Sequence, residues 1–248
     1  MTILPYGRQE IDESDIDAVS SVLRGDWLTT GPAVAEFEAA FAKSVGAEFA
    51  VSCSSGTAAL HLAAKAAGLS EENVALVPSV TFLATANAVR YVNSNVVFAD
   101  CDPRSGLSTV KEFTQASRHS DKPVRVIFPV HLGGQCVEPE TIRVLADSLG
   151  ATVIEDACHA LGTTYGAAET KVGACVHSDM AVFSFHPVKT VCCGEGGMVT
   201  TNSKTLAEKL KLFRNHGMVR SPDGFQNDRL AFDENGLANP WYYEMHEI

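Results

Sequence analysis

A lysine between an apolar strand and a glycine-rich turn has the clearest chemical potential in this sequence. Lys189 closes the segment 184–189, which also holds Ser184 and His186, and the glycine-rich run 194–197 follows it. A lysine amine can form a Schiff base with an aldehyde once it has lost its proton, and burial or nearby positive charge favours that loss. An ordinary solvated lysine is the alternative. The setting favours a reactive lysine.

A carboxylate follows the preceding apolar strand. Asp156 stands just past Ile154, at the carboxyl end of that strand, where ligands collect in α/β sheets. A carboxylate in this place can pair with a pyridinium nitrogen and keep it protonated, which makes the ring an electron sink. The alternatives are a helix cap and a solvated loop acid. Because Asp156 lies on the strand that precedes the lysine segment, the sequence favours one site that contains both Asp156 and Lys189.

The segment 54–57, Ser-Ser-Gly-Thr, joins an apolar strand to an alanine-rich helix predicted over 58–67. Backbone N–H groups and the positive end of the helix dipole would converge there, which suits a phosphate. An ordinary glycine turn with a serine cap would give the same pattern. The segment is therefore a candidate phosphate site only beside the other two motifs.

Short apolar runs alternate with helical patterns in the part of the chain that must position these groups. Repeated strand-helix units predict a buried, mostly parallel sheet. The last two runs are joined by a link too short for a helical crossover, so one strand there is expected to be antiparallel. The expected class is α/β, with a mostly parallel seven-stranded sheet and helices on both faces. The predicted strands are 49–53, 74–77, 96–99, 124–128, 152–155, 180–185 and 197–201.

Helical patterns flank this region. Asp12 is predicted to cap a helix that ends at Gly25, and a second amphipathic helix ends at Gly46. A further helix is expected over 203–213, and the sequence after it is polar and rich in turn-forming residues. We expect an N-terminal arm over 1–30, a large domain over 31–236 and the start of a small domain over 237–248.

Composition narrows the class of partner. The 248 residues carry a formal charge of −11, from 19 basic and 30 acidic residues, without a Lys/Arg cluster. Nucleic acids and anionic membranes are therefore not expected partners. The N-terminal residues hold no basic segment leading into a long apolar run, so a cytoplasmic protein is expected.

The seven cysteines lack CxxC spacing and are expected to be reduced packing residues, although Cys192-Cys193 could hold a reactive thiol. The histidines do not fall into a metal-ligand spacing either. No metal is assigned.

With these motifs in this order, the chain resembles the DegT/DnrJ/StrS sugar-nucleotide aminotransferases, a branch of the fold-type-I pyridoxal-phosphate enzymes. The similarity extends over essentially the whole chain. Within the family, the lysine segment looks most like the pseudaminic-acid transaminases, which aminate carbon four of a UDP-linked 4-keto-6-deoxy-N-acetylhexosamine. The segments that carry the resemblance are 29–32, 55–60, 78–82, 129–135, 155–157 and 183–189.

The resemblance implies pyridoxal 5'-phosphate as cofactor. It implies that Lys189 carries the cofactor and moves a proton, and that Asp156 holds the ring nitrogen. His159 would lie beside the ring hydroxyl, and Phe82 would stack on the ring, although such a phenylalanine alone is more often core. The phosphate residues would be Ser55, Gly56, Thr57 and Ser184, and the substrate residues Thr29, Thr30, His131 and His186, with a structural role equally open for either histidine.

The resemblance also implies a nucleotide-linked 4-keto-6-deoxy sugar as acceptor, glutamate as amino donor and a homodimer. The resemblance further implies a C-terminal small domain, of which we expect these 248 residues to contain only the start. Three alternatives stay open. A related dehydratase branch has histidine in place of the lysine; other fold-type-I enzymes, desulfurases or aldolase-like lyases, act on amino acids; and the chain could bind the cofactor without turnover.

Overall fold

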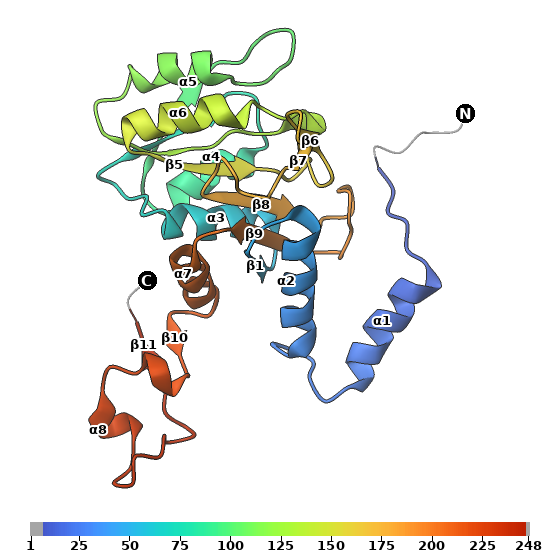
Figure 1. Cartoon of the computed structure of the whole chain (residues 1–248), viewed down its shortest axis with the longest axis vertical. Coiled ribbons are helices and arrows are strands. Elements are labelled where there is room, and N and C mark those ends of the chain that lie inside the picture. The colour runs from blue at the N-terminus through green and yellow to red at the C-terminus, as the bar shows by residue number, and fades with distance from the viewer. Residues whose placement is uncertain (1–6, 247–248) are drawn as a thin grey trace.

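A seven-stranded sheet forms the centre of the molecule in the computed structural model, which describes residues 7–246 (Figure 1). The strand order is β1-β9-β8-β5-β4-β2-β3. Only β9 runs antiparallel to its neighbours in this sheet, β1 and β8. The predicted α/β class, the seven strands and the antiparallel strand near the end are confirmed. The bounds are β1 (Phe49–Cys53), β2 (Val74–Pro78), β3 (Asn95–Ala99), β4 (Val124–Ile127), β5 (Thr152–Asp156), β8 (Met180–Ser184) and β9 (Gly197–Thr201).

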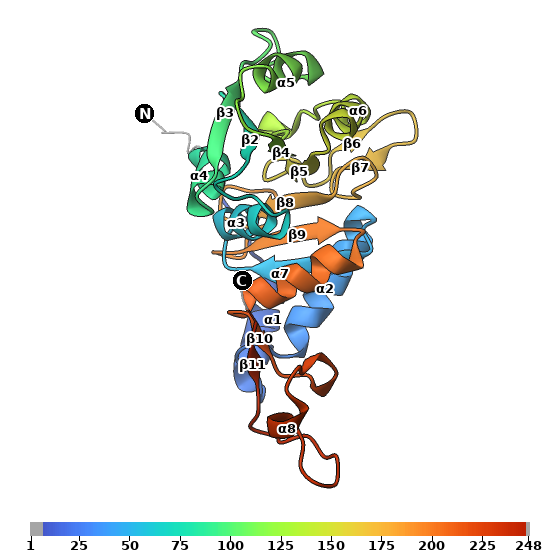
Figure 2. The ribbon, with the colours of Figure 1, turned by 90° about the vertical axis from the view of Figure 1, so that its left-hand side faces the viewer.

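Helices cover both faces of the sheet, as Figure 2 shows from the side. Successive strand residues point to opposite faces, so Leu76 packs with α5 and α6 while Val77 packs with α3 and α4. The chain therefore buries two apolar layers around one sheet. The helices are α2 (Pro32–Val45), α5 (Val110–Ser117) and α6 (Pro139–Leu149) on one face, and α3 (Gly56–Ala66), α4 (Leu83–Tyr91) and α7 (Lys204–Arg214) on the other.

Helix α3 begins two residues earlier than the predicted start at 58. The Ser55 side chain accepts a hydrogen bond from the Ala58 backbone N–H, which makes Ser55 the N-cap. Gly56 and Thr57 therefore lie in the first helical turn instead of in a preceding loop. The other predicted cap is confirmed, because Asp12 caps α1 (Glu13–Arg24) and Gly25 ends it.

The two ends of the described chain extend away from the sheet (Figure 1). Helix α1 has no buried residue. The C-terminal segment contains only short elements: β10 (Met218–Val219), η2 (Pro222–Gly224), α8 (Asp228–Ala231) and β11 (Glu244–Met245). The remaining elements are η1 (Leu132–Gly134) and the hairpin β6 (Thr164–Tyr165) and β7 (Thr170–Lys171). Residues 1–6 of the expected arm and 247–248 of the expected small domain lie outside the described residues, and the domain division stays a prediction.

Between residues 7 and 246, no helix combines the length and the apolar character that crossing a membrane requires.

Candidate active site

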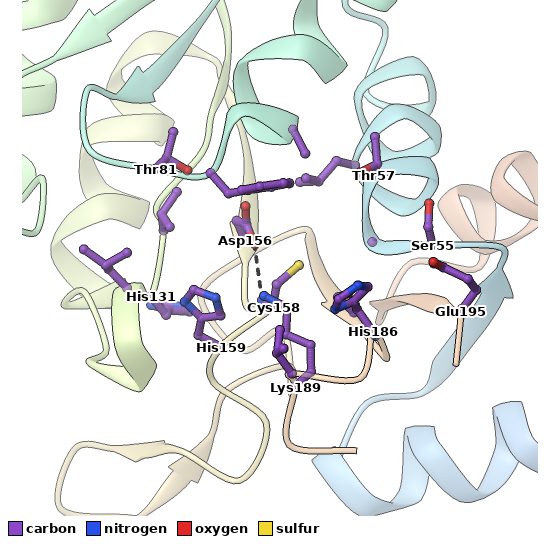
Figure 3. A pocket seen from close by; sticks show the side chains of 18 residues that line it. Ser55, Thr57, Thr81, His131, Asp156, Cys158, His159, His186, Lys189 and Glu195 are labelled. Atoms are coloured by element: carbon purple, nitrogen blue, oxygen red, sulfur yellow. Dashed lines mark hydrogen bonds between the residues drawn. The ribbon is translucent and has the colours of Figure 1, made fainter. Parts of the chain in front are cut away.

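One cavity lies where the carboxyl ends of the parallel strands meet. Its volume is about 410 Å³, within the range of small-molecule sites. The chain enters its wall after β1, β2, β4, β5 and β8, because parallel strands bring their carboxyl ends to a single edge. Figure 3 shows the side chains from these loops arranged around the cavity.

The cavity brings together all but two of the site residues predicted from the sequence. Thr29 and Thr30 are exposed in the loop between α1 and α2 and do not line it. Within the chain, these two threonines are therefore separated from the other candidates. The predicted residues that line the cavity are Ser55, Gly56, Thr57, Phe82, His131, Asp156, His159, Ser184, His186 and Lys189.

Asp156 is the buried acid of the cavity, with only 5% of its surface exposed. Its Oδ2 accepts a 2.6 Å hydrogen bond from the Thr85 hydroxyl, and its Oδ1 accepts one of 3.2 Å from the Cys158 backbone N–H. Its backbone N–H donates to Pro129, in the loop after β4. The carboxylate is thus held from two elements and keeps lone pairs for a ligand.

Lys189 lies in the loop after β8, and hydrogen bonds within this loop hold its backbone. The Lys189 backbone N–H donates to the His186 carbonyl at 2.8 Å, and Cys193 donates to Phe185 at 2.9 Å. These bonds fix the loop backbone on both sides of the lysine. Lys189 is half-buried and faces the same cavity as Asp156 (Figure 3).

His159 lies in the loop after β5, three residues after Asp156, and lines the same cavity as Lys189. Its Nδ1 accepts a 3.3 Å hydrogen bond from the Gly133 backbone N–H, so the hydrogen of the neutral ring is on Nε2. Burial, and after it the positive charge of Lys189, lowers the pKa of His159, against an opposing effect of Asp156. A neutral His159 can donate through Nε2.

The Lys189→Ala variant is expected to raise the pKa of His159. Removing a positive charge makes the imidazolium less unfavourable, while the burial that lowers the pKa remains. The pKa should therefore move toward, but stay below, its usual value of about 6.5. NMR titration of the His159 ring protons in both proteins measures it, and an unchanged titration would contradict the effect of the Lys189 charge on His159.

The first turn of α3 offers backbone N–H groups to the cavity. Ser55 satisfies only the Ala58 N–H, which leaves the N–H groups of Gly56 and Thr57 at the helix N-terminus. A Cβ on Gly56 would lie 2.7 Å from the Ser184 Cβ, so a side chain would displace Ser184 and narrow this turn. Two free N–H groups, a nearby hydroxyl and the helix dipole fit a phosphate.

Gly197 lets this turn approach the sheet. It is paired with Cys53 on one side and Ser184 on the other, and a Cβ there would lie 2.2 Å from the Ser55 carbonyl oxygen. Because the clash is with backbone, no side-chain rotation can relieve it. Gly197 therefore sets the height of the α3 turn above the sheet.

We expect Gly197→Ala to destabilise the fold by about 3 kcal/mol or more, since the overpacked atoms are backbone. Gly150→Ala is the control. Gly150 has open space around its Cβ position and a φ of 64°, so only a conformational cost of about 1 kcal/mol is expected. Urea unfolding of both variants tests the difference, and equal losses would disprove a backbone clash at Gly197.

His131 lines the cavity wall but is 1% exposed, and both its ring nitrogens are used inside the protein. Nδ1 accepts from the Val137 backbone N–H at 3.2 Å, and Nε2 lies 3.3 Å from Oε2 of Glu155. The proton is therefore on Nε2 and directed to the buried carboxylate. The structural role that the sequence left open for His131 is the one this geometry favours.

The cavity also contains residues that sequence reasoning did not select. Cys158, expected to be a packing residue, is on the cavity wall, where burial and then the charge of Asp156 raise its pKa well above the usual value. It is therefore a protonated thiol, and all seven cysteines are free of disulfides. Thr81 and Glu195 line the wall too. Thr85 lies behind it, in the first turn of α4, and no local sequence pattern singled it out.

Within residues 7–246, no group of three or more His, Cys, Asp or Glu side chains is arranged to hold a metal ion.

The fold and this cavity define an α/β protein with a ligand site at the carboxyl edge of its sheet, built around a lysine and a buried aspartate. The chain belongs to the DegT/DnrJ/EryC1/StrS aminotransferase family, whose sequence model matches residues 9–236. The central sheet and its helices are those of a fold-type-I aminotransferase large domain.

Individual relatives agree with this assignment. The spore coat polysaccharide biosynthesis protein SpsC of Bacillus subtilis is 35% identical over 243 residues, which are 98% of this chain and 58% of SpsC. PseC of Helicobacter pylori, an aminotransferase involved in the biosynthesis of pseudoaminic acid, is 30% identical with a TM-score of 0.78, covering 89% of this chain and 58% of PseC.

A more distant solved structure shares the fold. The PLP-form of the putative sugar aminotransferase Spr1654 from Streptococcus pneumoniae is 24% identical with a TM-score of 0.80, covering 98% of this chain and 60% of that one. This chain spans 58% to 60% of the length of the curated relatives that it matches.

Proposed function

We propose that this protein is a pyridoxal-phosphate-dependent aminotransferase that moves an amino group from glutamate to a nucleotide-linked 4-keto-6-deoxy sugar. The observation that carries the proposal is the shared cavity of Lys189, Asp156 and the first turn of α3. A lysine amine, a buried carboxylate and an anion-binding helix end are the three groups that hold this cofactor's aldehyde, ring nitrogen and phosphate. Family membership supports the same reaction type.

The residues present fit the cofactor. Asp156, buried and held by two donors, would keep the ring nitrogen protonated, and the Gly56 and Thr57 N–H groups with Ser184 would bind the phosphate. When bound, pyridoxal phosphate supplies an electron sink for the electrons released at the substrate carbon. Phe82, 72% exposed at the cavity mouth, presents a ring face that can stack on the cofactor.

Proton transfer falls to Lys189 and hydrogen bonding to His159. Lys189 Nζ would hold the cofactor covalently. Once released, the free amine would remove the proton from the amine-bearing carbon and deliver it to the cofactor carbon. His159, neutral because burial and Lys189 lower its pKa, would donate from Nε2 to the ring hydroxyl. His186, exposed on the wall, is left as the substrate-contacting histidine.

The relatives' names support the proposed acceptor, and exposed apolar surface supports the proposed assembly. SpsC and PseC are named for polysaccharide and pseudoaminic acid biosynthesis, which supports a nucleotide-linked keto sugar for this chain. Exposed apolar residues that line the cavity, Phe82 and Val188 among them, suit a homodimer in which a second copy covers the cofactor. Thr29 and Thr30, outside the cavity of their own chain, would then contact substrate across that interface.

The alternatives differ in testable ways. The dehydratase branch is disfavoured because Lys189 stands at the position where that branch has histidine. The amino donor that converts the cofactor distinguishes an enzyme acting on amino acids. The absence of any conversion distinguishes a binding protein without turnover.

The experiment is a half-reaction. The purified protein is loaded with pyridoxal phosphate and given glutamate, cysteine or threonine alone, and the cofactor absorbance and the released keto acid are followed. Conversion by glutamate, with 2-oxoglutarate formed, followed by amination of a nucleotide-linked 4-keto-6-deoxy sugar, is the expected result. Conversion by cysteine or threonine only would favour an amino-acid enzyme, and binding without conversion would favour the binding protein.

A further inference from the structure

A threonine outside the cavity lining holds the catalytic carboxylate in place. Thr85 lies in the first turn of α4 and is fully buried, and its hydroxyl donates to Asp156 Oδ2 at 2.6 Å. The two residues come from different strand-helix units, since Asp156 ends β5. The bond therefore crosses from one unit of the fold to another.

A second hydroxyl continues this contact. Thr81 Oγ1 lies 2.9 Å from Thr85 Oγ1, and the two residues are four apart at the start of α4. Because the Thr85 hydroxyl donates its single hydrogen to the carboxylate, it can only be the acceptor in the bond with Thr81. The order of donation is then Thr81 to Thr85 to Asp156, and bonds in such a chain strengthen one another.

The Asp156 side chain needs such a restraint. The terminal torsion of aspartate is broad, so packing alone fixes the carboxylate plane poorly. The Cys158 N–H bonds only to Oδ1, and Cys158 lies two residues from Asp156 in the same loop. Thr85 supplies the one other donor to this carboxylate within residues 7–246, from a helix fixed against the sheet.

We propose that Thr85 is a positioning residue that sets the direction in which Asp156 presents its carboxylate to the cavity. The inference rests on the proposed function for its catalytic meaning, because an oriented carboxylate matters to a ring nitrogen. Its structural part concerns Thr85 and Asp156 alone and can be tested without cofactor. Thr81 acts through Thr85 and has a smaller part.

Two variants separate the hydroxyl from the methyl group. Thr85→Val keeps the shape and removes the donor, and Thr85→Ser keeps the donor. Thr200→Val is the matched control: Thr200 is equally buried, and its hydroxyl donates at 2.8 Å to Gly173, outside the cavity lining. The measurements are crystal structures of the cofactor-free proteins, and the dissociation constant for pyridoxal phosphate by fluorescence titration.

Thr85→Val is expected to leave the fold intact, to turn the Asp156 carboxylate from its orientation in the parent protein, and to weaken cofactor binding about tenfold, as loss of a charge-assisted hydrogen bond implies. Thr85→Ser should keep the orientation and bind within about twofold of the parent. Thr200→Val should bind like the parent.

An unturned Asp156 in Thr85→Val would overturn the inference, and so would equal weakening in Thr85→Ser, which would assign the effect to packing. If the parent protein does not bind pyridoxal phosphate while Asp156 still turns in Thr85→Val, the proposed function fails and the positioning role of Thr85 stands.

Discussion

Lys189→Ala is expected to abolish covalent capture of the cofactor and to lower the rate of amino transfer by about a thousandfold or more, the scale of lost acid-base catalysis. The variant removes the one amine that lines the cavity among residues 7–246. Without it, neither a covalent link to the aldehyde nor proton transfer at the substrate carbon has a group to perform it. Stability should change little, because Lys189 is only half-buried.

Borohydride reduction of the cofactor-loaded protein, followed by peptide mass spectrometry, measures the capture. The parent should carry one pyridoxyl group, on Lys189. Lys189→Arg separates charge from nucleophile, since a guanidinium stays protonated and should also carry no label. Lys209→Ala, on the exposed face of α7, is the control and should be labelled like the parent. A label on another lysine in the Lys189→Ala protein would refute this assignment.

Asp156→Asn is expected to lower the transfer rate on the order of a hundredfold and to weaken cofactor binding. The amide keeps the volume and the bond from Cys158, but it removes the negative charge from a buried position. Removing one partner of a buried, hydrogen-bonded charge pair costs about 2–5 kcal/mol. A neutral amide would also no longer keep the ring nitrogen protonated.

Rate and cofactor affinity of the Asp156→Asn protein are compared with those of Asp147→Asn. Asp147 forms an ion pair with Arg143 on α6 and is largely exposed, so its loss should affect neither quantity. A rate in Asp156→Asn equal to that of the parent would show that the buried carboxylate plays no part in the reaction.

The sequence predicted the elements of this fold and the loops that carry its chemistry. Alternating strand and helix patterns have local causes, so the strands and the cap at Asp12 could be predicted without tertiary contacts. Lys189 and Asp156 could be selected because Asp156 ends a buried parallel strand and Lys189 lies in the loop after another, and such strands must end at one edge of the sheet.

Only the tertiary structure decided which side chains meet. The strand order places β5 beside β8, which brings Asp156 into the cavity of Lys189, and the fold places the first turn of α4 where Thr85 reaches the carboxylate. The pairing of His131 with Glu155 and the approach of Ser55 to Gly197 have the same origin. These contacts join segments far apart in the chain, and no local pattern encodes them, because they exist only after the sheet has set the distance between its strands.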